Sequence, residues 1–253
     1  MHPIAFELFG HVFYWYGVLI MIGSVIGEVL LVWFAWREGI PLDVALTWIL
    51  LLLVGGGAGA WLGGLARGAL AGHAGAGTLG HQGQFAHTAF VGIAIAAFVG
   101  TRLTGLSLWK LLDLAAPSVA LGFAIARVGC FMTGCCYGRP TNLPWGVTFP
   151  PFSPAWMAFG ETAVHPTQLY ASLGNLLLFI VLLFLRRRKR FDGFLFLSFI
   201  AMYVGLRFVL EIFRADPKLA LGLTAGQLAN LAIGPLAVVL LWVRGRSQRA
   251  RVA

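Results

Sequence analysis

The chain has 253 residues, of which 59% are hydrophobic and only 11% are charged. A soluble domain of this size could not cover its surface with so few polar side chains, so the composition excludes a soluble globular protein and predicts an integral membrane protein. The formal net charge of +9 does not indicate nucleic-acid binding, because the basic residues form no patch with interleaved aromatic side chains.

Seven apolar stretches are long enough, or nearly so, to cross ~30 Å of hydrocarbon as helices. The first is not a cleavable signal peptide, because no basic residue precedes it and the segment WFAWREG offers no small-residue cleavage site. The sequence therefore predicts an all-α integral membrane protein with about seven transmembrane helices in a single domain, residues 1–253. The predicted spans are approximately 12–36, 43–66, 88–102, 110–127, 167–185, 194–213 and 224–243.

Lysine and arginine predict the orientation, because they are enriched in cytoplasmic segments. With the N-terminus outside and the C-terminus in the cytoplasm, most of them lie inside: Arg37, Arg102, Lys110, the run RRRKR at 186–190, Arg244, Arg246, Arg249 and Arg251. These residues would also attract anionic lipid headgroups. The others lie at or near the outer face and need another explanation: Arg67, Arg127, Arg139, Arg207, Arg214 and Lys218.

Two outer segments are too long to be simple turns. One spans about 67–87 and is rich in Gly, Ala and His; His73 and His81 have no metal-ligand spacing and are predicted to be solvated. The other, 129–164, contains GCFMTGCCYGRPTNLPWG and is predicted to form a small periplasmic head between spans four and five. In the second span, glycines recur at four-residue spacing, which predicts close helix packing. These are Gly55, Gly59 and Gly63.

The sixth span carries an unusual polar stripe. Tyr203, Arg207, Glu211 and Arg214 fall on one face of the predicted helix. Ionisable groups within a membrane face the protein interior or water and are functional candidates by default. The alternative is a structural ion pair between Arg207 and Glu211, which would leave the second arginine uncompensated, so the functional interpretation is favoured.

The fifth span opens with HPTQLY. Pro166 suits the first turn of a helix, which places His165 at or just before the cap and Gln168 and Tyr170 one turn in. A helix N-terminus attracts anions, so an anion site and a purely structural cap are about equally favoured. His87, at the entry to the third span, is more often a structural histidine than a base.

Taken in order, these motifs resemble the prolipoprotein diacylglyceryl transferase family of seven-span bacterial inner-membrane enzymes. The resemblance implies transfer of a diacylglyceryl group from phosphatidylglycerol to the lipobox cysteine thiol of prolipoprotein signal peptides. A thioether forms and glycerol phosphate leaves; no cofactor and no metal is expected. The matching motifs are WYG at 15–17, FAH at 85–87, RVGCFMTGCCYGRPTNLPWGVTFP at 127–150, HPTQLY at 165–170, YVGLRFVLEIFR at 203–214 and TAGQ at 224–227.

The resemblance also implies roles for individual residues. Arg127 and Arg207 would be the essential arginines, and arginine suits phosphate through bidentate contacts. Glu211 and Arg214 would position them, and Tyr16 and His87 would complete the cavity. A thiol of pKa ~8.5 needs a base, for which His87 is the first candidate and Glu211 the second. The substrate-binding residues would be Gly129, Gly134, Gly138, Arg139, His165, Gln168, Tyr170, Tyr203 and Arg214.

The chain departs from the family at Cys130, where asparagine is usual, and at Cys135, where glutamate is usual. With Cys136, these residues could be small buried side chains, or a disulfide with one thiol left over, or reactive thiolates or a metal site with His87 or His165. A metal is least favoured, because C-x4-C-C is not a standard zinc spacing. Further departures are Trp61, Thr88, Ala89 and Ala171.

Two alternative functions follow from these departures. A paralogue could use the same lipid-facing cavity and its cysteines for thiol, metal or other small-acceptor chemistry. A non-catalytic lipid-binding membrane protein is the other alternative.

Overall fold

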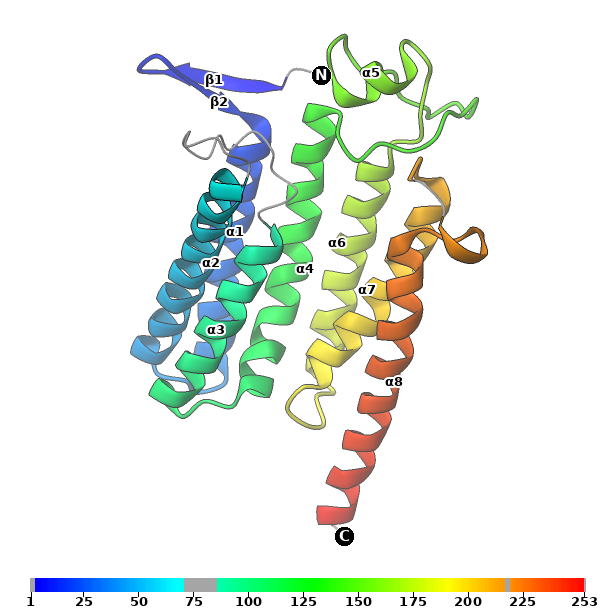
Figure 1. The fold of residues 1–253 in the computed structure, drawn as a ribbon. Coiled ribbons are helices and arrows are strands. Elements are labelled where there is room, and N and C mark those ends of the chain that lie inside the picture. The colour runs from blue at the N-terminus through cyan, green and yellow to red at the C-terminus, as the bar shows by residue number, and fades with distance from the viewer. Residues whose placement is uncertain (1–2, 71–85, 217–218, 253) are drawn as a thin grey trace. The chain divides into compact units, whose positions relative to one another are not determined.

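The described residues fold mostly into helices, which follow a short hairpin (Figure 1). The computed structural model describes residues 3–70, 86–216 and 219–252. In chain order the elements are β1 (Ile4–Leu8), β2 (His11–Tyr14), α1 (Trp15–Arg37), α2 (Leu42–Leu70), α3 (Ala86–Thr104), α4 (Leu108–Thr133), α5 (Pro154–Phe159), α6 (Thr167–Arg186), α7 (Phe194–Phe213), the 3-10 helix η1 (Ala220–Gly222) and α8 (Ala225–Val252).

The seven predicted spans correspond one to one with helices. Within the described ranges, α1, α2, α4, α6, α7 and α8 are long and apolar enough to cross a membrane. The third predicted span is also helical, but the apolar part of α3, Val91–Thr104, is shorter. A helix satisfies its own backbone hydrogen bonds, which hydrocarbon requires. The prediction of an all-α integral membrane protein is confirmed.

The first span begins later than predicted, because residues 11–14 are extended. β1 and β2 pair antiparallel, and Phe9 and Gly10 between them have positive φ angles of 51° and 77°. Positive φ at both central residues is typical of the type I′ turn that two-residue hairpins prefer. Phe6 and Phe13 stack across the hairpin with ring centroids 4.8 Å apart. Hydropathy did not predict this hairpin, because its aromatic residues count as apolar in a helical window.

The chain forms two compact units, which are described separately: residues 1–30 with 112–253, and residues 31–111. In the second unit α2 packs on α3. A methyl group added to Gly55 would lie 2.6 Å from the carbonyl oxygen of Gly92, and one added to Gly59 or Gly63 would collide with Thr88. The predicted role of these glycines in close helix packing is confirmed.

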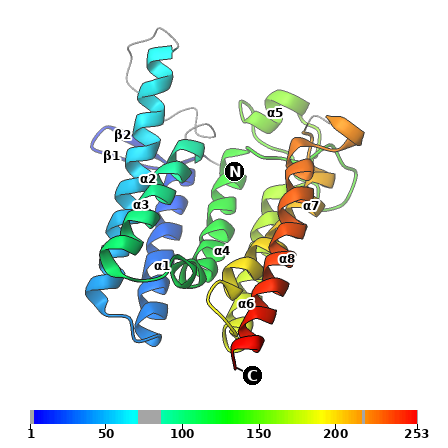
Figure 2. The same ribbon diagram turned by 60° about the horizontal axis from the view of Figure 1, so that its bottom comes forward.

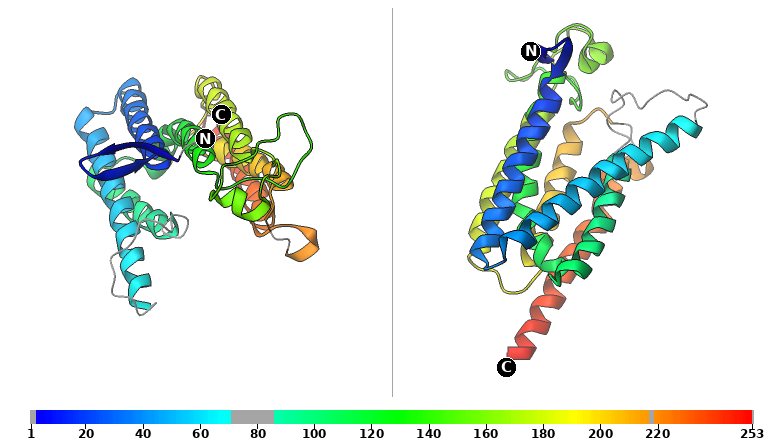
Figure 3. Two further views of the ribbon diagram at one scale, coloured as in Figure 1. Left: turned by 90° about the horizontal axis from the view of Figure 1, so that it is seen from above. Right: turned by 90° about the vertical axis from the view of Figure 1, so that its left-hand side faces the viewer.

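The helical part of the first unit contains α4, α6, α7 and α8. α7 packs against α6 and α8, and Figure 2 shows these three helices together. The C-terminal part of α8 extends beyond the other helices of this unit (Figure 3). Side chains from α4, α6 and α7 form the core: Ala116, Ala120, Leu178, Leu182, Leu195 and Phe199.

The head between α4 and α6 begins later than predicted. α4 continues to Thr133, so Gly129 and Cys130, placed at the start of the predicted head segment 129–164, are helical. The helix ends where Gly134 takes a φ of 69°, which is the usual glycine stop. The head contains α5 and a small core of its own, formed by Phe149, Ala155 and Val164.

Candidate active site

Arg127 lies near the end of α4 and is half-buried. Its electrostatic neighbours are Cys130, Cys136, Tyr203 and Arg214. None of the carboxylates that the structure describes forms an ion pair with Arg127. A half-buried guanidinium close to a second one is costly unless an anion approaches it. The position therefore favours a negatively charged ligand.

Tyr16, at the start of α1, belongs to the same cluster. It interacts electrostatically with Arg127 and with all three cysteines. A Cβ atom on Gly129 would lie 3.1 Å from the Cα atom of Tyr16, so α1 can approach α4 this closely only next to a glycine. Gly129 therefore helps to place Tyr16 beside Arg127.

The stripe on α7 holds an ion pair and is tied to α8. Arg207 Nη2 donates to Glu211 Oε1 at 2.7 Å, and Thr224 Oγ1 donates to Glu211 Oε2 at 3.1 Å. Thr224 also accepts from the backbone N–H of Gln227 at 3.1 Å, while the Gln227 side chain accepts from the backbone N–H of Thr224 at 3.1 Å. This reciprocal pair is a capping box, which explains the TAGQ motif at the start of α8. Glu211 is thus buried with both oxygens bonded.

The sequence interpretation left Arg214 without a compensating charge, but the structure gives it one. Its Nε and Nη2 atoms donate to the two carboxylate oxygens of Asp216 at 2.6 and 3.2 Å. The hydrogen bond from Arg214 lowers the pKa of Asp216 below its ordinary value, against a smaller opposing effect of burial. The helix ends at Phe213, so Asp216 lies beyond it and the helical-face pattern could not place its side chain. An acidic residue shortly after a basic helix end was the available signal.

The HPTQLY segment binds the turn that carries two of the cysteines. Thr167 Oγ1 donates to the carbonyl oxygen of Cys136, and Gln168 Nε2 donates to that of Cys135, both at 2.7 Å. Pro166 is the N-cap residue of α6 and does not lie in its first turn, and the cap has no side-chain hydrogen bond. The first residues of α6 therefore hold the neighbouring loop in place by hydrogen bonds.

His165 lies buried where three backbone segments meet. Gly138 donates its N–H to the carbonyl oxygen of His165 at 3.0 Å, and Arg139 donates its N–H to that of Phe213 at 2.8 Å. A Cβ atom on Gly138 would lie 2.6 Å from both His165 Cβ and the Phe213 carbonyl oxygen. Glycine is thus required for this crossing. The side chain of Arg139 itself is exposed.

Tyr170 connects the start of α6 to the head. Its hydroxyl accepts from Trp145 Nε1 at 2.8 Å and lies 3.3 Å from His165 Nδ1. Trp145 had no predicted role, and only the tertiary structure brings it to Tyr170. Burial, with the charge of Arg139, lowers the pKa of His165.

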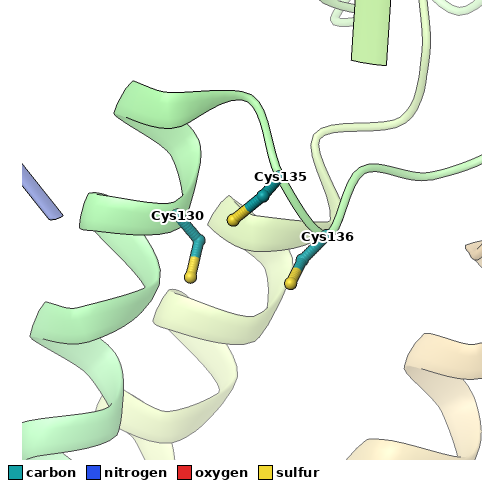
Figure 4. Close-up of side chains that lie close together, drawn as sticks. All are labelled: Cys130, Cys135 and Cys136. Atoms are coloured by element: carbon teal, nitrogen blue, oxygen red, sulfur yellow. The ribbon is translucent and has the colours of Figure 1, made fainter. Parts of the chain in front are cut away.

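All three cysteines are free thiols, and their Sγ atoms lie within 4.8 Å of one another (Figure 4). Cys130 comes from the last turns of α4, while Cys135 and Cys136 come from the turn that follows. Hydrogen bonds from the other two thiols lower the pKa of Cys136, and the charges of Arg127 and Arg214 act in the same direction against the effect of burial. The disulfide that the sequence left open is not formed.

Some predicted residues lie outside what the structure describes. His87 belongs to the first turn of α3, but its side chain is among those not described. His73 and His81 lie in the segment 71–85, which is also outside the described residues. The remaining predicted catalytic and substrate-binding residues all belong to the first unit.

Comparison with known proteins places the chain in a family. The sequence pattern of prolipoprotein diacylglyceryl transferase matches residues 3–243. A phosphatidylglycerol–prolipoprotein diacylglyceryl transferase of Clostridium tetani is 33% identical over 223 residues, covering 86% of this chain and 87% of the relative. Proteins of the same name from Finegoldia magna and Dehalococcoides mccartyi are each 32% identical and cover 98% of this chain, with 97% and 95% of the relatives covered. These similarities support the transferase prediction and not the paralogue alternative. The chain belongs to the prolipoprotein diacylglyceryl transferase family.

Proposed function

We propose that this protein transfers the diacylglyceryl group of phosphatidylglycerol to the cysteine thiol of a prolipoprotein signal peptide. The names of its relatives state the same lipid donor and protein acceptor. Membership of the family and the six membrane-length helices among the described residues support a reaction at a membrane surface. The bacterial inner membrane is the compartment where both substrates meet.

The observation that carries the proposal is the charge arrangement around Arg127. This guanidinium makes no ion pair with a described carboxylate and has Arg214 as a like-charged neighbour. Its neighbour on α7, Tyr203, lies on the same helical face as Arg207. Arg127 and Arg207 would therefore border one space, in which a phosphodiester oxygen can neutralise Arg127.

The reaction needs this positive charge most when the phosphate group leaves. The acceptor sulfur loses its proton, attacks the glyceryl carbon and forms a C–S bond while the C–O bond to phosphate breaks. Glycerol phosphate leaves with an additional negative charge. Guanidinium groups aimed at the leaving phosphate stabilise that charge as it develops. Glu211 and Asp216 hold Arg207 and Arg214 by hydrogen bonds of 2.7 and 2.6 Å.

A base must take the thiol proton. Glu211 is a poor choice for this task, because Arg207 and Thr224 occupy both of its oxygens. We therefore assign Glu211 the positioning of Arg207 and not the role of the base. Tyr16 and Tyr203 would border the headgroup next to Arg127.

The proposal is tested with purified protein, phosphatidylglycerol vesicles and a synthetic signal peptide that carries one lipobox cysteine. The wild-type chain is expected to release one glycerol phosphate for each thioether formed. Arg127→Gln is expected to lower kcat by about 10²–10³-fold, the usual effect of losing one donor to a developing charge. Arg246→Gln is the control, because Arg246 is exposed and stacks on Trp242 at 3.8 Å from its ring.

Two results would contradict the proposal. One is a wild-type protein that forms no thioether with either substrate in excess. The other is an Arg127→Gln variant as active as Arg246→Gln.

A further inference from the structure

The three thiols are clustered by the way α4 ends. The N–H of Gly134 donates to the carbonyl oxygen of Phe131, and the N–H of Cys135 donates to that of Cys130, both at 3.2 Å. This pair of hydrogen bonds is a Schellman motif, in which a left-handed glycine reverses the chain at a helix end. The motif folds Cys135 back over Cys130. A cysteine pair at this spacing, with glycine immediately before the second, is therefore adjacent in space.

The third thiol is held in place by its neighbours. Cys136 has a φ of 57°, a backbone angle that residues other than glycine rarely adopt. Its carbonyl oxygen accepts from Thr167 at 2.7 Å and from Arg214 at 3.5 Å. Gln168 holds the preceding carbonyl at 2.7 Å. Strained backbone that surrounding groups hold in this way is typical of functional sites.

The donor set selects one class of ligand. The cluster offers three sulfur atoms, and the described residues include no carboxylate or imidazole that completes it. Thiolates select soft metal ions and disfavour Mg²⁺ or Ca²⁺. Zn–S bonds of ~2.3 Å put the sulfur atoms of one zinc site ~3.8–4.0 Å apart. Sulfur atoms within 4.8 Å of one another need only small side-chain movements to reach that geometry.

The charges around the cluster also suit a metal thiolate. Three thiolates and one Zn²⁺ carry a net negative charge. Arg127 and Arg214 are both electrostatic neighbours of the cysteines, and they would offset that charge. Spacing along the sequence had made a metal the least favoured interpretation. It could not show that a helix reversal brings the sulfur atoms together.

We propose that Cys130, Cys135 and Cys136 form a three-thiolate Zn²⁺ site whose open fourth position takes the acceptor thiol of the prolipoprotein. Zinc in proteins is almost always four-coordinate, and catalytic sites leave one position for water or substrate. The second part of this proposal rests on the proposed function.

The metal would supply what the thiol transfer needs. The acceptor S–H would give its proton to the base, and Zn²⁺ held by the three cysteines would keep its sulfur as a thiolate, because a coordinated thiol is deprotonated. A lone pair of that sulfur then forms the C–S bond to the glyceryl carbon, and the C–O bond to phosphate breaks as glycerol phosphate leaves. The zinc keeps its oxidation state throughout.

The site is tested on the reduced, full-length protein in detergent. The wild type is expected to bind one Zn²⁺ per chain by elemental analysis and to show sulfur-to-metal charge-transfer bands when Co²⁺ replaces zinc. Losing a supporting partner of a metal ligand already costs 10–100-fold in affinity, so each single Cys→Ser variant is expected to bind zinc more than about 100-fold more weakly. Thr133→Val is the control, because it removes a 3.4 Å hydrogen bond to Cys135 Sγ and two hydrogen bonds to the backbone carbonyls of Gly129 and Cys130 but leaves all three sulfur ligands in place.

A second measurement needs no variant. The chain has three cysteines and no others, so zinc is expected to protect all three from a maleimide reagent in the folded wild type. A folded wild type that binds no zinc and shows no thiol protection would overturn the site, whatever its activity. Occupancy by Cu⁺ in place of zinc would do the same.

The catalytic part has its own readout. Chelation of zinc is expected to abolish thioether formation, and adding Zn²⁺ is expected to restore it, while Arg127→Gln still binds zinc. Transfer that continues unchanged without zinc would overturn the acceptor role. A wild type that binds zinc but never transfers lipid would contradict the proposed function, and with it the acceptor role, while supporting the metal site.

Discussion

At the scale of single residues, His165 shows how burial tunes an ionisable group. His165 is 6% exposed, and its ring packs edge-on against Phe213 and Tyr170, with centroid distances of 5.2 and 6.1 Å. Its backbone pairs with residues 138 and 139 at the crossing described above. Desolvation and the nearby Arg139 lower the pKa of His165 in the folded protein. The neutral ring therefore belongs to the native structure.

This shift predicts a pH dependence of stability. The unfolded chain takes up a proton near pH ~6.5, and the folded protein does so only at lower pH. The stabilisation is therefore complete above the unfolded pKa and is lost as the pH falls through the folded one. The midpoint temperature of thermal unfolding is expected to decrease as the pH is lowered from about 7 to about 5. The decrease is expected to be smaller in His165→Gln.

The matched control is His11→Gln, because His11 lies exposed on β2. Intrinsic fluorescence or helical circular dichroism in detergent reports the midpoint. An identical pH slope in wild type and His165→Gln would contradict the expectation.

At the scale of elements, α7 receives its N-terminal cap from another helix. Its own N-cap residue, Gly193, has no side chain to offer. Asp113 of α4 replaces it, because its carboxylate accepts the N–H groups of Gly193 and Phe196 at 2.9 and 3.0 Å. Lys189 Nζ lies 3.3 Å from the same carboxylate. Asp113 is 1% exposed, so this contact couples the two helices inside the protein.

Replacing this cap is expected to destabilise the first unit. Asp113→Asn keeps one oxygen but leaves a buried N–H without an acceptor, which costs roughly 1–3 kcal/mol. Asp192→Asn is the control, because it loses only a 3.0 Å surface pair with Lys189, of the kind that contributes about 0–1 kcal/mol. Thermal unfolding of both variants should separate them, and equal midpoints would refute the cap.

Elements differ in how well a sequence predicts them. Helices that must cross hydrocarbon are specified by apolar length, and all seven appeared where hydropathy placed them. Their ends were less accurate. α4 continues to Thr133 and ends at Gly134. The first span loses residues 12–14 to a hairpin, whose turn residues outweigh its apolar content.

At the scale of the whole molecule, the basic residues predict the orientation in the membrane. The distribution of Lys and Arg predicts the N-terminus outside and the C-terminus in the cytoplasm, with the head 134–166 on the outer side. In the first unit the head and the C-terminal end of α8 lie at opposite ends (Figure 1). A fluorescent protein fused after residue 253 is therefore expected to fold in the cytoplasm and fluoresce.

The same experiment carries its own control. Alkaline phosphatase inserted after Leu143, in the exposed part of the head, is expected to be active because it reaches the periplasm. Fusion of the phosphatase at the C-terminus should give no activity. The reverse pattern would show that the orientation is wrong.

The sequence alone determined the membrane class, the positions of the seven apolar helices, the family and the polar stripe that begins on α7. Each of these depends on residues close together in the chain, where hydrophobic length and helical periodicity act directly. Tertiary structure alone decided that Asp216 binds Arg214, that Trp145 donates to Tyr170, and that the three cysteine sulfur atoms form one cluster. Those contacts depend on how helix ends reverse and which loops they meet, and a contact between distant segments leaves no local pattern for periodicity to detect.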